Sequence, residues 1–273
     1  MANKIWFITG TSKGFGRIWA EAALDRGDKV IATARDLNDL TDLQSKYGDS
    51  VLTLSLDVTD KNACFAAVKQ GHDQFGRLDV VVNNAGYGQF GAVEELSEKE
   101  LRDQLETNLF GVLWVTQAAL PYMREQNSGR ILQISSIGGV NAFPLIGAYH
   151  ASKWALEGLS QSLAQEVKEM GIHVTLVEPV GYSTDWAGPS SKTAEPLPAY
   201  DKAREAMKER RKGASVGDPQ ATASVMLKLV DMENPPLRMF FGDYANGMIH
   251  TEYDKRLSEW DEHQDLSVEA MGN

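Results

Sequence analysis

Short apolar runs rich in β-branched residues alternate with longer segments of helical period along most of this chain. Such alternation is typical of βαβ units, in which helices connect parallel strands. The run Val80–Val82 has no polar alternation, as expected for a strand that helices cover on both faces. The sequence therefore predicts an α/β chain with a doubly wound Rossmann fold, a seven-stranded parallel sheet flanked by helices on both faces. The predicted strands are Lys4–Thr9, Lys29–Ala34, Val51–Leu56, Val80–Val82, Arg130–Ser135, His173–Val177 and Arg238–Phe241.

Two of the predicted helices are the clearest, Leu109–Arg124 and Tyr149–Met170. In the second, apolar residues recur at spacings of three and four, which predicts one apolar stripe along the helix. Gly171 is expected to end this helix. The residues of the stripe are Leu156, Leu159, Leu163, Val167 and Met170.

Residues 182–217 depart from the alternating pattern. The first part of this segment is rich in Pro, Gly and Ser, and the charged helical run Asp201–Lys212 follows it. An insertion of this kind is typical of a mobile substrate lid. The acidic stretch 244–273 is weakly periodic and is expected to form a terminal helix with a frayed end. We find no internal repeat and expect a single catalytic domain over residues 1–273.

Charge and cysteine content limit the classes of function. With a formal net charge of −11, the chain is expected to repel nucleic acid and anionic lipid. No apolar run approaches the roughly 20 residues that span a bilayer, and Ile5–Ile8 is too short for a secretory signal. The single cysteine, Cys64, excludes an intrachain disulfide and is expected to be a buried small residue. We expect a cytoplasmic protein without a nucleic-acid or membrane partner.

A glycine-rich loop follows the first predicted strand and opens a helix. Glycines permit a tight turn and let the backbone approach a pyrophosphate, while the free N–H groups of the helix attract its charge. The spacing Gly-x3-Gly-x-Gly is a weak signal alone, and an ordinary strand-to-helix turn is the alternative. The place of the loop after the first strand of a βαβ unit favours dinucleotide binding. The predicted contact residues are Gly10, Ser12, Lys13, Gly14, Phe15 and Gly16.

The end of the second predicted strand carries information on the cofactor. A site for NAD commonly has a carboxylate there for the ribose 2′-hydroxyl, but this chain has Arg35. A guanidinium suits a 2′-phosphate, and Lys13 is expected to reach the same group, which favours NADP(H). The alternatives are that both cations are solvated surface charges, or that the neighbouring Asp36 serves NADH.

Tyr149 and Lys153 are four residues apart on a predicted helix, so their side chains share one face. An ammonium beside a phenol stabilises the phenolate and is expected to lower the pKa of Tyr149 from about 10 toward neutrality. Ser136 follows the fifth predicted strand, at the edge where open α/β sheets bind ligands, and can hydrogen-bond a substrate carbonyl. The Tyr-x3-Lys spacing alone is common by chance, so it is the combination of Ser136 with Tyr149 and Lys153 that favours a catalytic role.

Several further motifs occur in order along the chain. They are Thr9–Gly16, Asp57-Val58, Asn83-Asn84-Ala85-Gly86, Asn108, Ser136, Tyr149 with Lys153, and Pro179-Val180-Gly181 with Thr184. In this order and spacing they resemble the short-chain dehydrogenase/reductase family over about residues 4–242, and most closely its 17β-hydroxysteroid-dehydrogenase-like and bacterial ketoreductase branch. One departure is Val180, which separates a proline and a glycine that are commonly adjacent in the family.

The resemblance implies roles for these residues. Lys153 holds the nicotinamide ribose, Asn108 anchors a water between Lys153 and a proton relay, and Thr184 meets the nicotinamide carboxamide. Plain alternatives are a turn at Asn83–Gly86 and a polar residue at a helix kink for Asn108. The remaining residues implied to border the cofactor are Asp57, Val58, Asn84, Ala85, Gly86, Pro179 and Gly181.

Aromatic residues near strand ends and in the predicted lid are candidates for an apolar substrate pocket, with core or interface positions as the alternative. His150 points about 100° around the helix from Tyr149, which favours a surface or subunit-contact role. The five histidines are scattered, and we expect no metal. The pocket candidates are Tyr87, Phe90, Phe143, Tyr182 and Trp186.

The sequence thus predicts an NADPH-dependent carbonyl reductase or alcohol dehydrogenase, with Tyr149 transferring the proton and a bulky apolar ketone or secondary alcohol as substrate. The main alternative is a non-catalytic protein that senses NADP(H). A sugar-nucleotide epimerase is disfavoured, because only about 30 residues follow the last strand. The resemblance also implies a homodimer or homotetramer built on Leu109–Arg124 and Tyr149–Met170.

Overall fold

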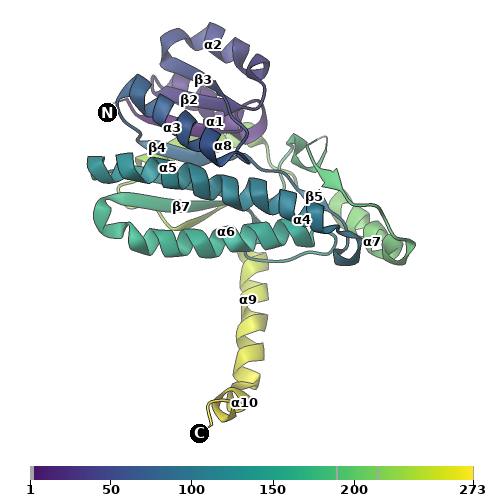
Figure 1. Cartoon of the computed structure of the whole chain (residues 1–273). Coiled ribbons are helices and arrows are strands. Elements are labelled where there is room, and N and C mark those ends of the chain that lie inside the picture. Colours follow the sequence, from purple (N-terminus) through teal and green to yellow (C-terminus); the bar gives the residue numbers. More distant parts are fainter. Residues whose placement is uncertain (1–2, 189, 214, 273) are drawn as a thin grey trace.

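The protein is described by a computed structural model that covers residues 3–188, 190–213 and 215–272. Its main sheet has seven parallel strands in the order β3-β2-β1-β4-β6-β7-β9 (Figure 1), which confirms the expected Rossmann-type fold. Each expected strand lies within two residues of an observed one at both ends. The strands are β1 Ile5–Thr9, β2 Lys29–Ala34, β3 Val51–Ser55, β4 Val80–Asn83, β6 Gly129–Ile134, β7 Ile172–Pro179 and β9 Arg238–Phe241.

Helices cover both faces of the sheet, because alternate residues of each strand point to opposite sides. On β1, Ile8 packs in a cluster with α1, α2 and α8, whereas Phe7 packs with α3, α5 and α6. Cys64 is fully buried on α3, as expected, and burial raises the pKa of its thiol to about 12. The helices are α1 Gly14–Asp25, α2 Thr41–Tyr47, α3 Lys61–Phe75, α5 Gly111–Gln126, α6 Gly147–Glu166 and α8 Thr222–Asp231.

The apolar stripe expected on α6 is only partly correct. Leu156 is fully buried, but Leu159 and Met170 are each 36% exposed, and α6 ends at Glu166, before a short 3-10 turn. The physical reason is that polar residues occupy much of the inner face of α6. Tyr149, Lys153, Glu157 and Ser160 all lie buried there.

The strand order reverses between β1 and β4. From β1 the chain continues to β2 and β3 on one side, then returns to β4 on the other side of β1, where Phe7 pairs with Val81. The connections diverge at this point, so a crevice forms beyond the carboxyl ends of the two strands. A second, two-stranded sheet lies near this edge, and its strands were too short to be predicted. It joins β5 Gln89–Phe90 to β8 Lys192–Thr193.

The segment expected to be a lid contains α7 Asp201–Lys212, at the expected position. It is tied to the body through the turn after β5. Arg204 Nη1 donates to Glu95 Oε1 at 2.6 Å, and the hydroxyl of Tyr200 donates to Glu94 Oε2 at 2.6 Å. The Leu197 N–H and the Arg204 guanidinium lower the pKa of Glu95 to about 2, so the anchor is ionised at neutral pH. This segment is therefore held at both α7 and the turn that precedes it.

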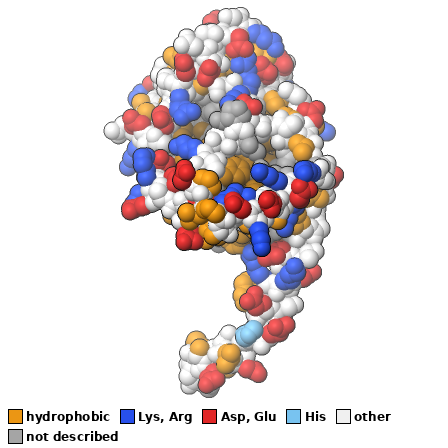
Figure 2. Space-filling model, turned by 90° about the vertical axis from the view of Figure 1, so that its right-hand side faces the viewer, with side chains coloured by type: hydrophobic (Ala, Val, Ile, Leu, Met, Phe, Trp, Pro, Cys, Tyr) orange, Lys and Arg blue, Asp and Glu red, His pale blue; other side chains and the backbone are white. Residues whose placement is uncertain are grey.

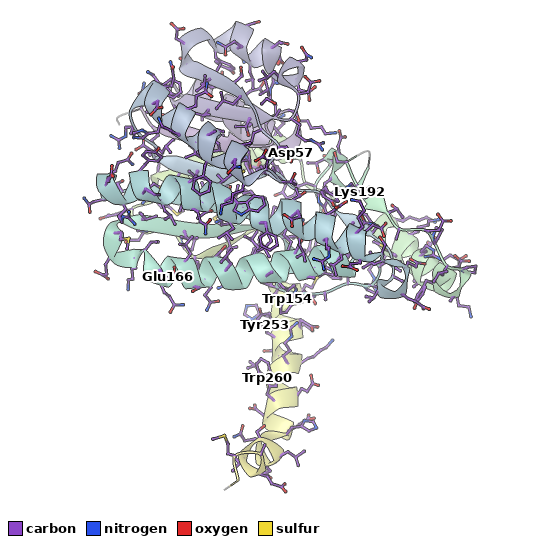
Figure 3. All side chains as sticks on the ribbon, viewed as in Figure 1. Asp57, Trp154, Glu166, Lys192, Tyr253 and Trp260 are labelled. Carbon is purple, nitrogen blue, oxygen red and sulfur yellow. The ribbon has the colours of Figure 1, made fainter. Side chains whose placement is uncertain are left out.

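The C-terminal region is a helical arm, α9 Ala245–Glu262 followed by α10 Gln264–Glu269, that projects from the body (Figure 1). Figure 2 shows side chains of both charges along the arm, with a few hydrophobic ones between them. At its root the Arg256 guanidinium lies 4.7 Å from the ring centroid of Trp154 on α6 and 5.4 Å from that of Tyr253 (Figure 3). Among the described residues, no helix combines the length and apolar character that crossing a membrane requires.

Candidate active site

A cavity of about 1660 Å³ lies beyond the carboxyl ends of the strands. Its volume exceeds the roughly 300–1,000 Å³ typical of a pocket for one small ligand. Asp57 after β3 and Lys192 in β8, both labelled in Figure 3, contribute to its walls. Of the predicted cofactor-binding and catalytic residues, Gly16 and Asn108 lie outside the lining. The others line it: Gly10, Ser12, Lys13, Gly14, Phe15, Arg35, Asp57, Val58, Asn84, Ala85, Gly86, Ser136, Tyr149, Lys153, Pro179, Gly181 and Thr184.

The glycine loop between β1 and α1 has the backbone geometry that a dinucleotide site needs. Gly10 and Gly14 have φ values of 71° and 60°, a region that glycine adopts without strain. A Cβ on Gly16 would lie 2.3 Å from the carbonyl oxygen of Gly10. Gly16 therefore lets α1 approach the loop. Lys13 at the N-cap makes no side-chain cap, which leaves the first N–H groups of α1 for an anion.

The end of β4 braces this loop. Asn84 Nδ2 donates to the carbonyl oxygens of Thr9 and Gly10 at 2.9 and 3.0 Å. The hydroxyl of Thr9 accepts from the backbone N–H groups of Asn84 and Ala85 at 3.0 and 2.9 Å. These bonds join the two strands at which the sheet order reverses, and they hold the loop in one conformation.

Arg35, at the end of β2, is exposed and lines the cavity. The carboxylate of Asp36 instead accepts from the Asn38 N–H at 2.9 Å and caps the following turn. Lys13 Nζ donates to Asp185 of the lid segment at 2.9 Å, so its charge is shared with the lid. Of the two cations expected at a 2′-phosphate, only Arg35 lacks such a carboxylate partner in the described chain.

Tyr149 and Lys153 share the cavity face of α6, and each is 6% exposed. Lys153 Nζ lies 5.7 Å from the ring centroid of Tyr149 and donates to the carbonyl oxygen of Ile134, the last residue of β6, at 2.6 Å. The Ser136 hydroxyl hydrogen-bonds the Tyr149 side chain and accepts from the Gly138 N–H at 3.0 Å. The serine, the phenol and the ammonium are therefore gathered on one wall of the cavity.

Burial dominates the electrostatics of this pair. It raises the pKa of Tyr149 to about 12, against the lowering effect of the Ser136 hydrogen bond. It also lowers the pKa of Lys153 to about 8, although the charge of Glu157 acts in the opposite direction. The pKa shift of Tyr149 is therefore opposite in direction to the expected one, because desolvation of the phenol outweighs the Ser136 hydrogen bond.

Asn108 lies in a π-helical turn, Glu106–Phe110, between α4 Glu98–Leu105 and α5. Such single π turns are frequent at functional sites. Asn108 Nδ2 donates to the carbonyl oxygen of Tyr87 and to Ser152 Oγ, both at 3.1 Å. Ser152 in turn donates to the carbonyl oxygen of Tyr149 at 2.7 Å. Asn108 thus supports the helix that carries Tyr149, and Ser152, which the sequence analysis missed, is the link.

The expected surface position of His150 is wrong, since this residue is 5% exposed. Its Nδ1 lies 2.7 Å from the carbonyl oxygen of Gly138, and the Phe143 N–H donates to its Nε2 at 2.8 Å. A carbonyl only accepts, so the proton is on Nδ1. The loop after Ser136 covers the face of α6 that was expected to meet solvent. Within the described chain, no three His, Cys, Asp or Glu side chains gather in a way that would hold a metal ion.

Aromatic rings crowd the part of the cavity beside Tyr149. The indole of Trp186 lies 4.8 Å from the Tyr149 ring and 5.7 Å from the Phe90 ring, measured between centroids. At the opposite end, Phe15 lies 5.1 Å from Tyr182. Of the predicted pocket residues, Phe90 contacts Trp186 but does not line the cavity, whereas Tyr87, Phe143, Tyr182 and Trp186 do.

The model of the short chain dehydrogenase family matches residues 4–195. The chain belongs to this family. Among the curated relatives, the oxidoreductase BOA17 of Botryotinia fuckeliana is 47% identical over 89% of this chain and 90% of its own length. The 3-ketodihydrosphingosine reductase of Bacteroides thetaiotaomicron is 38% identical over 89% of both chains.

A solved short-chain dehydrogenase from Streptomyces avermitilis is 40% identical and superposes with a TM-score of 0.91 over 98% of both chains. The superposition includes the helices and loops as well as the sheet, because only 2% of either chain lies outside the superposed region. The chain is thus a short-chain dehydrogenase with the seven-stranded fold, an oxidoreductase by family, and it acts with a nicotinamide cofactor on a small molecule.

Proposed function

We propose that this short-chain dehydrogenase is an NADP(H)-dependent carbonyl reductase and alcohol dehydrogenase in which Tyr149 transfers the proton. The observation that carries the proposal is the gathering of Ser136, Tyr149 and Lys153 on one wall of the large cavity at the sheet's reversal point. Neutral phenol is the form that donates a proton during reduction, and the raised pKa of Tyr149 keeps it neutral.

Reduction places negative charge on the carbonyl oxygen of the substrate. A bound nicotinamide supplies the hydride for this reaction. Ser136 donates a hydrogen bond to that oxygen, and the Tyr149 hydroxyl gives it a proton. Lys153 stabilises the resulting phenolate, and the Asn108–Ser152 link keeps the turn of α6 that carries Tyr149 in place. Oxidation of an alcohol follows the same path in reverse.

The residues at the end of β2 support NADP(H) rather than NAD(H). Arg35 lines the cavity, and a guanidinium binds a 2′-phosphate through paired hydrogen bonds. Asp36, the neighbouring acid considered for the 2′-hydroxyl of NADH, caps the next turn instead. Lys13 can bind the same 2′-phosphate if its ammonium exchanges the Asp185 carboxylate for the phosphate.

The substrate that the cavity supports is a bulky, largely apolar ketone or secondary alcohol. Trp186, Tyr87 and Phe143 provide aromatic surface on its walls. The similarity to a reductase named for 3-ketodihydrosphingosine, a long-chain ketone, is consistent with this substrate class. The lid role of residues 182–217 belongs to the same proposal.

The alternative of a non-catalytic NADP(H) sensor is less well supported. Sensing requires a dinucleotide site but no proton donor, whereas Tyr149 is buried against Ser136 and Lys153 at the cavity wall. A sensor would bind NADPH and leave its absorbance unchanged with every carbonyl compound.

We also propose a homodimer or homotetramer, with α5 and α6 at the interface. Phe110 before α5 and Trp154 and Leu159 on α6 are each more than a third exposed, which is consistent with a covered surface in an oligomer. The lone buried cysteine is consistent with the cytoplasmic location that we expect. Light scattering coupled to size-exclusion chromatography measures the number of subunits.

The test of the proposed function is a screen of ketones and alcohols by NADPH absorbance. We expect oxidation of NADPH with apolar aryl or long-chain ketones and reduction of NADP with the matching alcohols. Binding of NADPH without turnover across the panel would support the sensor instead, and absence of binding would contradict both.

A further inference from the structure

A buried carboxylate continues the line of catalytic residues along α6. Tyr149, Lys153 and Glu157 are spaced four residues apart, so they lie one above the other on the same face of the helix. Glu157 is 6% exposed, as are the other two. A carboxylate that is removed from water must be paired and hydrogen-bonded, so its contacts indicate what it does.

Glu157 joins α6 to the end of β6. The hydroxyl of Ser135 donates to Glu157 Oε1 at 2.5 Å. Ser135 lies between Ile134, whose carbonyl accepts from Lys153 Nζ, and Ser136. Space here is tight, because a Cβ on Gly139 would lie 2.6 Å from Ser135 Oγ. One carboxylate therefore fixes the short segment that carries both the anchor of Lys153 and the substrate-binding serine.

The other oxygen of Glu157 faces β9 and β7. Arg238 Nε, at the start of β9, donates to Glu157 Oε2 at 2.9 Å and lies 3.6 Å from Glu178 Oε1 on β7. Glu178 is fully buried, and neither of its carboxyl oxygens has a hydrogen-bond partner among the described residues. Burial and the nearby charge of Glu157 raise the pKa of Glu178 to about 8. Glu157 is therefore the carboxylate of the pair that is hydrogen-bonded to Arg238, and Lys153 lies one turn before it on the same helix.

We propose that Glu157 is a positioning residue for proton transfer: its carboxylate holds the end of β6 in register with Lys153 and lies one turn from Lys153 on the same face of α6. This proposal rests on the proposed function in one respect, namely that Lys153 stabilises the Tyr149 phenolate during the reaction. It assigns Glu157 no contact with substrate or cofactor. Its effect on the reaction passes through Lys153 and Ser136.

The direct test is the titration of Lys153 Nζ by NMR of lysine-labelled protein, with Lys153→Met assigning the signal. Glu157→Gln keeps an oxygen that accepts from Ser135 and removes the charge. We expect its Lys153 titration midpoint to fall by about one pH unit or more. The matched control is Glu166→Gln, which removes an exposed carboxylate at the far end of α6 from Trp154 (Figure 3) and leaves the midpoint unchanged. An unchanged midpoint in Glu157→Gln would overturn the proposal.

The kinetic test separates charge from position. In Glu157→Gln the alkaline fall in kcat for reduction moves to lower pH, because Lys153 loses its proton earlier. Ser135→Ala keeps the charge and removes the hydrogen bond, so kcat falls about tenfold with the same pH profile. If Glu157→Gln does not fold, wild-type kcat in Ser135→Ala refutes the positioning role. A wild-type protein without turnover would contradict the proposed function, and the NMR titration would still decide the role of Glu157.

Discussion

The indole of Trp186 lies 4.8 Å from the phenol ring of Tyr149, so the segment after β7 covers the group that we propose as the proton donor. The indole also packs closely against the backbone at Gly88, since a Cβ on Gly88 would lie 2.7 Å from the Trp186 ring. The indole therefore excludes water from one side of the phenol and forms a wall against which a carbonyl substrate packs.

Replacement of Trp186 by alanine tests this wall. We expect kcat/KM for an apolar ketone to fall about tenfold, mainly through KM, because an aromatic contact is lost from the pocket. Dinucleotide affinity should change little. Phe65→Ala removes an aromatic ring that is 41% exposed on α3, outside the cavity lining, and is the matched control. An unchanged KM in Trp186→Ala would mean that the substrate does not contact the indole.

Replacement of Arg35 by glutamine tests the cofactor preference. We expect KM for NADPH to rise about tenfold or more, while KM for NADH changes little, because only NADPH carries the 2′-phosphate. Arg124→Gln removes an exposed guanidinium from α5 and controls for net charge. Equal changes in the two KM values would contradict the assignment of Arg35.

Substitution of Gly16 by alanine tests the packing of the glycine loop. The new Cβ would lie 2.3 Å from Gly10 O and 2.5 Å from Asn84 Nδ2, so the loop must shift. We expect dinucleotide binding to weaken by about tenfold or more, measured by titration of NADPH fluorescence. Gly247→Ala, where no atom of the described residues lies within 4 Å of the new Cβ, is the control and should stabilise α9 by about 0.5–1 kcal/mol. Normal affinity in Gly16→Ala would show that the loop tolerates the methyl group.

Glu178 makes stability depend on pH. Its folded-state pKa of about 8 lies above the ordinary value of 4.5, so the folded protein holds this proton more tightly than the unfolded chain. The stabilisation is complete below about pH 4.5 and is lost as the pH rises through about 8. We expect Glu178→Gln to reduce the fall in Tm between about pH 5 and about pH 9, roughly the range bounded by these pKa values. Calorimetry across this pH range measures Tm. Glu166→Gln should keep the wild-type slope, and an identical slope in Glu178→Gln would contradict the assignment.

The strands and most of the site were predictable because they depend on local pattern. Apolar runs place the strands, and polar residues such as Ser136 follow directly after strand ends. The burial of His150 was not predictable, since it depends on a loop that folds back over α6 and presents Gly138 O and Phe143 N–H to the imidazole.

Ser152 and Glu157 were missed for a related reason. Each is one polar residue on a helix that has many, and the role that we propose for it depends on a partner distant in sequence, Asn108 for the first and Arg238 for the second. The direction of the pKa shift of Tyr149 could not be predicted, because the spacing to Lys153 is visible in the sequence whereas the burial of the phenol is not.

The central claim is that the Tyr149 hydroxyl donates the proton when a carbonyl substrate is reduced. The most direct measurement is kcat for NADPH oxidation by Tyr149→Phe with the best ketone of the screen, together with NADPH affinity from fluorescence. We predict a loss of about 10²–10⁴-fold in kcat with affinity nearly unchanged, because one hydroxyl is removed and the ring remains. A kcat within a few-fold of wild type would contradict the claim.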